Sequence, residues 1–97
     1  MEKNVHMVIL YDIYNELLTD SQKQYFEEYY FNNLSLAEIS ENLDVSRNAV
    51  HKQIKVIEKK LEDFENVLKL YSKSIKLEKI IKKIDNKEIK KELEELL

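Results

Sequence analysis

The 97-residue sequence contains no glycine, no proline and no cysteine. Tight hairpin turns favour glycine at positions of positive φ, so a fold built from many short strands is not expected. Without cysteine, the chain can form neither a disulfide nor a thiolate metal site. Without glycine, it lacks the loop that cradles phosphates in P-loop proteins. These absences, with 43% hydrophobic and 36% charged residues, favour an all-α fold.

Targeting signals and catalytic motifs are also missing from the sequence. The N-terminal apolar run, residues 5–18, contains Asp12 and Glu16, which the apolar core of a signal peptide would not. We therefore expect a cytoplasmic protein with no membrane partner. The two histidines, His6 and His51, have no carboxylates at ligand spacing, and no nucleophile motif is present. We predict no catalytic residues, no metal, no cofactor and no enzymatic activity.

The charge is divided unevenly along the chain. The formal net charge is −3, but residues 1–45 hold two basic and nine acidic residues, whereas residues 46–97 hold fourteen basic and ten acidic residues. A protein with a broad phosphate footprint is usually basic, so the overall charge argues against strong autonomous DNA binding. The acidic front and basic back indicate either complementary packing or a local basic face.

Two helices are predicted in the front part of the chain. The first covers residues 4–18 and is apolar nearly all round, which favours burial on several sides and contact with a second subunit. The second follows Thr19, which forms a capping box with Gln22. It is aromatic on one face, and helical spacing favours a core role for that face over a base-stacking platform. The aromatic residues are Tyr25, Phe26, Tyr29, Tyr30 and Phe31.

A short third helix is predicted over residues 36–43. Asn32 and Asn33 end the preceding helix because asparagine tolerates left-handed backbone. Ser35 and Glu38 form a second capping box at the start of the new helix. A turn then follows the helix at residues 44–45.

Ser46 caps a long fourth helix in which no breaker appears before Asp85. Its apolar residues keep a heptad spacing that is typical of a helix packed along one stripe. Asp85 and Glu88 form the capping box of a short terminal helix. The back part of the stripe is predicted to serve as dimer contact or core, and it consists of Leu61, Phe64, Leu68, Tyr71 and Ile75.

Residues 34–57 have the pattern of a helix-turn-helix. A short helix is followed by Asp44 and by Val45 as an apolar plug, and then by a capped helix. Asp44 occupies the turn position that glycine often fills, which weakens the pattern. We divide the single helical domain, residues 1–97, into this module and an extension with a terminal helix, residues 58–97. The outward polar residues of the second helix are Arg47, Asn48, His51, Lys52 and Lys55.

These five side chains suit nucleic acid. Arg47 could pair with guanine and Asn48 with adenine, while Lys52 and Lys55 could meet phosphates. Arg47 is also the only arginine among sixteen basic residues. The alternative is a helix-turn-helix that packs only against protein, and the sequence leaves both interpretations open.

The sequence also resembles a known family. The runs L-T-D-S-Q-K-Q-Y-F-E-E-Y-Y, L-S-L-A-E-I-S and V-S-R-N-A-V are similar to those of the bacterial YlxM family, whose helix-turn-helix resembles region 4 of sigma factors. The resemblance covers about residues 8–71. It implies a role beside the signal recognition particle, since members are encoded next to its components, and it implies no catalytic residues.

Three functions therefore stay open at this point. The chain is expected to be a regulator of the signal recognition particle pathway whose helix-turn-helix contacts DNA or the particle's RNA. It could also be a DNA-binding transcriptional regulator, or a protein-only adaptor that docks on the particle's GTPase. Each of these includes a homodimer, because the apolar surface exceeds what a chain of this length is expected to cover.

Overall fold

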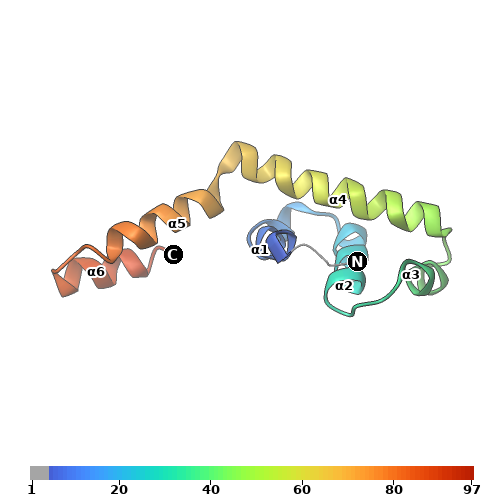
Figure 1. The fold of residues 1–97 in the computed structure, drawn as a ribbon, viewed down its shortest axis with the longest axis horizontal. Coiled ribbons are helices and arrows are strands. Elements are labelled where there is room, and N and C mark those ends of the chain that lie inside the picture. The colour runs from blue at the N-terminus through green and yellow to red at the C-terminus, as the bar shows by residue number, and fades with distance from the viewer. Residues whose placement is uncertain (1–4) are drawn as a thin grey trace.

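The computed structural model describes residues 5–97, which form six α-helices, one short 3-10 helix and no strand. The predicted all-α fold class is confirmed. Helices α1 to α3 lie along one side of α4, and α5 and α6 extend away from them as an arm (Figure 1). The molecule is elongated, measuring 56 × 24 × 23 Å. The elements are α1 (Val5–Tyr14), η1 (Asn15–Leu17), α2 (Asp20–Tyr30), α3 (Leu36–Leu43), α4 (Arg47–Leu68), α5 (Leu70–Ile81) and α6 (Lys87–Glu94).

Both predicted capping boxes in the front part of the chain are confirmed. The Thr19 hydroxyl accepts from the Gln22 N–H at 3.1 Å, and the Gln22 side chain accepts from the Thr19 N–H at 3.0 Å. Ser35 and Glu38 exchange the same two bonds, each at 3.1 Å. Each box satisfies two of the N–H groups that have no partner inside the helix, which fixes where α2 and α3 begin.

The first helix is shorter than predicted. The expected helix ran from residue 4 to residue 18; residue 4 lies outside the described residues, and α1 ends at Tyr14, followed by η1. The Asn15 side-chain amide donates to the carbonyls of Tyr11 and Asp12, at 3.0 and 3.1 Å. These side-chain hydrogen bonds occupy two carbonyls in the last turn of α1 and favour the tighter 3-10 turn of η1.

The aromatic face of α2 belongs to the core, as predicted. The Phe26 ring is fully buried and stacks between Tyr11 and Tyr30, with ring centroids 4.1 and 4.2 Å apart. Phe31 stays 51% exposed at the edge of this stack. The surrounding cluster joins α1, α2 and the middle of α4, and its buried members are Met7, Leu10, Tyr11, Tyr14, Leu18, Phe26, Ile57 and Leu61.

A second cluster holds the helix-turn-helix together. Ile39 from α3 and Val50 from α4 have no exposed surface, and they pack with Tyr29 and Ile54. The cluster therefore ties α2, α3 and the first turns of α4 into one rigid unit. The two clusters follow each other along α4, from Val50 to Leu61, so this helix is packed against the other helices over most of its length.

The long fourth helix does not continue to Asp85, which corrects the sequence prediction. Helix α4 ends at Leu68, Lys69 takes left-handed backbone with φ 56°, and α5 begins at Leu70. The stripe is accordingly not one continuous line. Of its predicted members, Leu61 is buried, Phe64, Tyr71 and Ile75 are half-buried, and Leu68 is 41% exposed.

The bend at Lys69 is held by side chains on either side of it. The Tyr14 hydroxyl donates to Glu65 Oε1 at 2.6 Å and accepts from the Leu70 N–H at 3.1 Å. The Glu65 carboxylate accepts from the N–H groups of Tyr71 and Ser72, both at 3.1 Å. Together they satisfy the first three N–H groups of α5, so a residue of α1 and a residue of α4 cap the next helix.

The bonds at the bend also set the ionisation of Glu65. Burial disfavours its charged form, but the bonds from Tyr14, Tyr71 and Ser72, with His6 nearby, together lower the pKa of Glu65 below its usual value. Burial raises the pKa of the Tyr14 hydroxyl, and its bond to Glu65 adds to this effect. Glu65 is therefore a charged acceptor at neutral pH, facing a protonated phenol.

The arm has little core of its own. Ile81 is its single buried side chain in the described part of the chain. The predicted cap of the last helix is wrong by one residue, since Asn86 rather than Asp85 accepts from the N–H groups of Glu88 and Ile89, at 3.0 and 3.1 Å. Among residues 5–97, no helix is long and apolar enough to cross a membrane.

Candidate nucleic-acid interface

The turn that precedes α4 is built from left-handed backbone and one serine cap. Asp44 has φ 54°, so it takes the left-handed backbone conformation that glycine often supplies at this turn position. The N–H of Val45 donates to the Ser40 carbonyl at 3.1 Å, and the Ser46 hydroxyl accepts from the Ala49 N–H at 3.0 Å. These bonds close the turn and fix where α4 begins.

Val45 is not a buried plug, which corrects the prediction made for it. Its side chain is 36% exposed. The space between α3 and α4 is filled instead by Ile39 and Val50, while backbone hydrogen bonds close the turn. The helix-turn-helix is therefore held by its helix–helix core and not by an apolar residue in the turn.

The predicted contact residues share the solvent side of α4. Arg47, Asn48, His51, Lys52 and Lys55 are all exposed, and spacings of three and four residues put them on neighbouring turns. Asn48, His51 and Lys52 line a shallow, open hollow of about 410 Å³ together with Ser46 and Ala49. The structure thus leaves all five residues exposed on one side of α4, next to the stripe that contains the buried Val50 and Ile54.

The positive charge of this face is concentrated at its N-terminal end. Lys55 Nζ lies 3.5 Å from Glu58 Oε1, and Glu58 also accepts a hydrogen bond from the Tyr30 hydroxyl, whose pKa is raised by burial and by that carboxylate. Within residues 5–97, neither Arg47 nor Lys52 has an ion pair. Glu58 was missed from the sequence, although its spacing of three from Lys55 was the available signal.

Acidic side chains surround the start of the motif. Glu38, Glu41 and Asp44 are exposed on α3 and the turn. Hydrogen bonds from the backbone and side chain of Ser35 lower the pKa of Glu38, so a negative charge is fixed at the N-terminus of α3. A phosphate at that helix end would be repelled, which leaves the first turns of α4 as the part of the motif that suits an anion.

The described residues do not form a metal centre. No group of three or more histidine, aspartate or glutamate side chains among residues 5–97 could hold a metal ion. His51 lies on the exposed face of α4, whereas His6 lies near Tyr71 at the bend, with ring centroids 5.9 Å apart. The two histidines therefore belong to different parts of the molecule.

Comparison with known proteins gives one family. Residues 1–97 match the family UPF0122, described as "Putative helix-turn-helix protein, YlxM / p13 like". A UPF0122 protein of Caldanaerobacter subterraneus subsp. tengcongensis is 49% identical over 78 residues, which are 80% of this chain and 67% of that protein. One of Streptococcus mutans is 51% identical over 72 residues, or 74% and 66% of the two chains. One of Oceanobacillus iheyensis is 44% identical over 84 residues, or 87% and 80%.

Proposed function

This chain belongs to the UPF0122 family of YlxM / p13-like helix-turn-helix proteins, and from that premise we propose that it is a non-enzymatic cytoplasmic regulator whose α4 binds nucleic acid. One observation carries the proposal. The exposed side of the first turns of α4 holds two cations without an ion pair among the described residues, Arg47 and Lys52, beside the polar side chains of Asn48 and His51.

Each of these side chains has a role that its chemistry allows. The Arg47 guanidinium suits the two acceptors of guanine, and the Asn48 amide suits the donor and acceptor of adenine. Lys52 suits a phosphate, and the ion-paired Lys55 contributes less because Glu58 partly offsets its charge. With so few cations on this face, we expect α4 to bind nucleic acid weakly and in a way that depends on other contacts, in keeping with the net charge of −3.

The proposed setting is protein targeting. The similarity to YlxM proteins supports a role in the signal recognition particle pathway, with the particle's RNA or DNA as the nucleic acid. A transcriptional regulator would use the same face of α4 on DNA alone. The two differ in the ligand that binds more tightly and not in the residues that make the contacts.

The direct test is fluorescence anisotropy at low salt with labelled duplex DNA and with signal recognition particle RNA. The double variant Arg47→Ala with Lys52→Ala should lose most of the binding and lower the slope of log K against log salt by about 2 or less. The matched control is Lys59→Ala, because Lys59 is exposed on the same helix but is paired with Asp63 at 3.0 Å. Absence of any complex with either nucleic acid would refute the proposal.

The acidic front supports a second candidate, an adaptor that docks on protein such as the particle's GTPase. Residues 5–45 hold one lysine and eight acidic residues, a net charge of −7. This surface would attract a basic protein and repel nucleic acid. Under this candidate, the charge reversal Lys52→Glu with Lys55→Glu would leave binding to the GTPase intact, and loss of the complex in a pull-down would contradict it.

The proposed regulator also acts as a homodimer. Two copies would present two α4 helices, as helix-turn-helix dimers do on paired half-sites. The support lies in the arm, where large apolar side chains stay exposed on α5, on α6 and after them.

A further inference from the structure

In the arm, more large apolar side chains are exposed than are buried. Beyond Lys69 only Ile81 is buried among the described residues, while large apolar side chains stay about half exposed or more. Helices as short as α5 and α6, with 12 and 8 residues, are marginal on their own in water. An exposed apolar patch on such an element indicates a surface that another molecule covers. The exposed residues are Leu70, Ile80, Ile89, Leu96 and Leu97.

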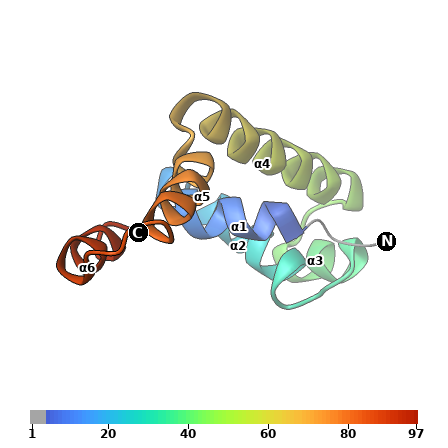
Figure 2. The same ribbon diagram turned by 60° about the vertical axis from the view of Figure 1, so that its left-hand side comes forward.

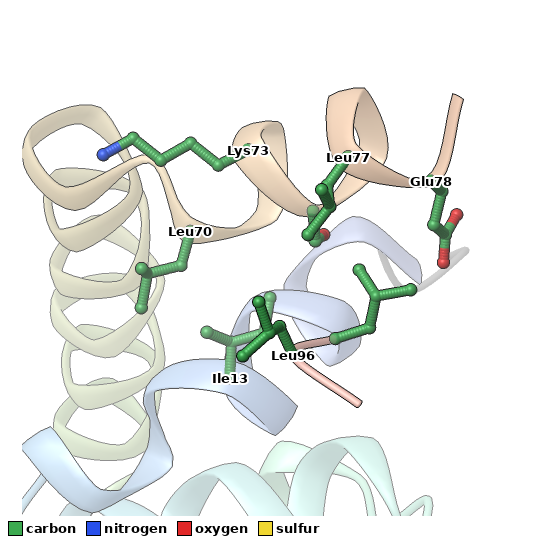
Figure 3. A pocket seen from close by; sticks show the side chains of 8 residues that line it. Ile13, Leu70, Lys73, Leu77, Glu78 and Leu96 are labelled. Atoms are coloured by element: carbon green, nitrogen blue, oxygen red, sulfur yellow. The ribbon is translucent and has the colours of Figure 1, made fainter. Parts of the chain in front are cut away.

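An apolar groove lies where the arm meets the body. It has a volume of about 460 Å³, and its lining comes from α1, from one face of α5 and from the last residues of the chain. In Figure 3, Ile13, Leu77 and Leu96 face one another across this space, Lys73 extends away from it toward the end of α4, and Glu78 lies beyond Leu77 on α5. Figure 2 shows α5 passing next to α1, so the groove follows the angle between the two helices.

The two sides of the groove differ in charge. Ile13 of α1 lines the groove, and two exposed carboxylates lie close to it in the sequence, Asp12 on α1 and Glu16 in η1. Residues 69–83, which include α5, hold six lysines and one acidic residue, a net charge of +5. Among residues 5–97, the two ion pairs are both within α4, so none joins the basic arm to the acidic body of the same chain.

We propose that this groove is the homodimer interface, and that it receives α5 of a second copy in antiparallel orientation. The antiparallel arrangement brings the C-terminal half of each α5 to the α1 helix of the other copy. Ile80, which is 54% exposed, then enters the apolar groove. Lys76 lies one turn before Ile80 on the same side of α5, and Lys83 follows in the turn after the helix, where its N–H donates to the Ile80 carbonyl at 3.0 Å. In the proposed dimer these two lysines meet Asp12 and Glu16 of the other copy.

The proposed interface is self-complementary. A two-fold axis makes the same patch serve twice, so each copy supplies one apolar groove with an acidic rim and one basic helix with an apolar edge. Nucleic acid fits the groove less well, because the lining is mostly leucine and isoleucine and its single lysine, Lys73, is accompanied by the carboxylate of Glu78. Contact of the arm with nucleic acid would use the lysines alone and would leave the exposed apolar side chains uncovered.

The first test is the mass of the full-length protein by sedimentation equilibrium. A dimer is expected at micromolar concentration, and Ile80→Asp should raise the dimer dissociation constant by about 30-fold or more, since it puts a charge in the centre of the contact. The matched control is Val56→Asp, the same kind of change at a residue 45% exposed on α4, which should leave the dimer intact. A monomer, or a dimer that Ile80→Asp leaves unchanged, would overturn the proposal.

The second test uses charge exchange and does not depend on removing an apolar residue. One variant carries Asp12→Lys with Glu16→Lys, and the other carries Lys76→Glu with Lys83→Glu. Each alone should be monomeric, because like charges then face each other in both contacts. Mixed in equal amounts, they should form a heterodimer in which both contacts pair opposite charges. Failure of the mixture to associate would overturn the antiparallel arrangement.

This inference deepens the homodimer of the proposed function and is independent of nucleic-acid binding. Mass reports dimer formation, while anisotropy of a labelled nucleic acid reports contact by α4. A dimer that binds neither DNA nor RNA would refute the nucleic-acid role and keep the interface. A monomer whose nucleic-acid binding is weakened by Lys76→Glu with Lys83→Glu would instead identify the arm as a nucleic-acid surface and overturn the interface.

Discussion

Residues 5–68 and residues 69–97 are both helical, but different forces hold them. In the first region, twelve buried hydrophobic side chains join four helices around two neighbouring clusters. The arm buries one, Ile81, and is attached through the hydrogen bonds of Tyr14 and Glu65 and through Tyr71, which packs against the body's cluster. The body is therefore held by a shared hydrophobic core, whereas the position of the arm depends on a small number of contacts at the bend.

This difference predicts that the body, residues 5–68, is more stable against local opening than the arm, residues 69–97. Regions with few buried apolar contacts open with lower free energy than the core to which they are attached. The candidate nucleic-acid face of α4 lies on the well-packed body, so its five side chains are expected to keep their spacing. The arm is expected to exchange its amide hydrogens faster than the body unless a second copy covers it.

The largest effect is expected at the centre of the body. Phe26→Ala removes a fully buried ring stacked between Tyr11 and Tyr30, so it should lower the free energy of unfolding by about 3–5 kcal/mol. Urea denaturation followed by circular dichroism measures this loss. The control, Phe31→Ala, removes a ring that is 51% exposed and should cost much less. Equal losses in the two variants would mean that the aromatic stack is not the core of the body.

The sequence predicted the body better than the arm, for a physical reason. The caps at Thr19, Ser35 and Ser46 are local, so each could be recognised within four residues of sequence. The bend at Lys69 is not local, because lysine is a good helix former and the heptad spacing continues through it. Its cap comes in part from Tyr14, more than fifty residues away, and no periodicity reports such a contact.

The candidate interface shows the same division. Helical spacing was enough to place Arg47, Asn48, His51 and Lys52 on one exposed face. It did not show that Lys55 is partly neutralised by Glu58, or that Val45 stays exposed, because both depend on how the helices pack.

A smaller effect is expected at the junction between the two regions. Glu65→Ala leaves the first N–H groups of α5 without their acceptor, and the loss of such bonds costs about 1–3 kcal/mol. Hydrogen exchange should show faster opening at Leu70, Tyr71 and Ser72, while the amides of α2 keep their protection. The matched control is Glu62→Ala, since Glu62 is exposed one turn earlier. Loss of protection throughout the body would show that the arm and the body unfold as one unit.

The junction also predicts a dependence on acid. Because the folded protein lowers the pKa of Glu65, its contribution to stability is present above the pKa of an unfolded glutamate, about 4.3, and is lost as the pH falls through the lower folded value. Opening of the arm, followed by hydrogen exchange corrected for intrinsic rates, should therefore increase below that pH. In Glu65→Gln the increase should be smaller, because the amide does not titrate. An identical acid response in both proteins would assign the effect to other carboxylates.

The smallest effect is expected at Lys69, where a glycine substitution distinguishes a bend between α4 and α5 from one continuous helix. Lys69 has φ 56°, a conformation that glycine adopts without the cost that other residues bear, so Lys69→Gly should stabilise the junction by up to about 1 kcal/mol. The same substitution within α5, Lys76→Gly, should destabilise the arm by about 1 kcal/mol, because glycine is a poor helix former. If α4 and α5 instead formed one helix, as the heptad spacing alone suggests, both substitutions would be destabilising. Opposite signs in hydrogen exchange across residues 65–81 would therefore establish the bend, and with it the groove between α1 and α5 that the bend creates.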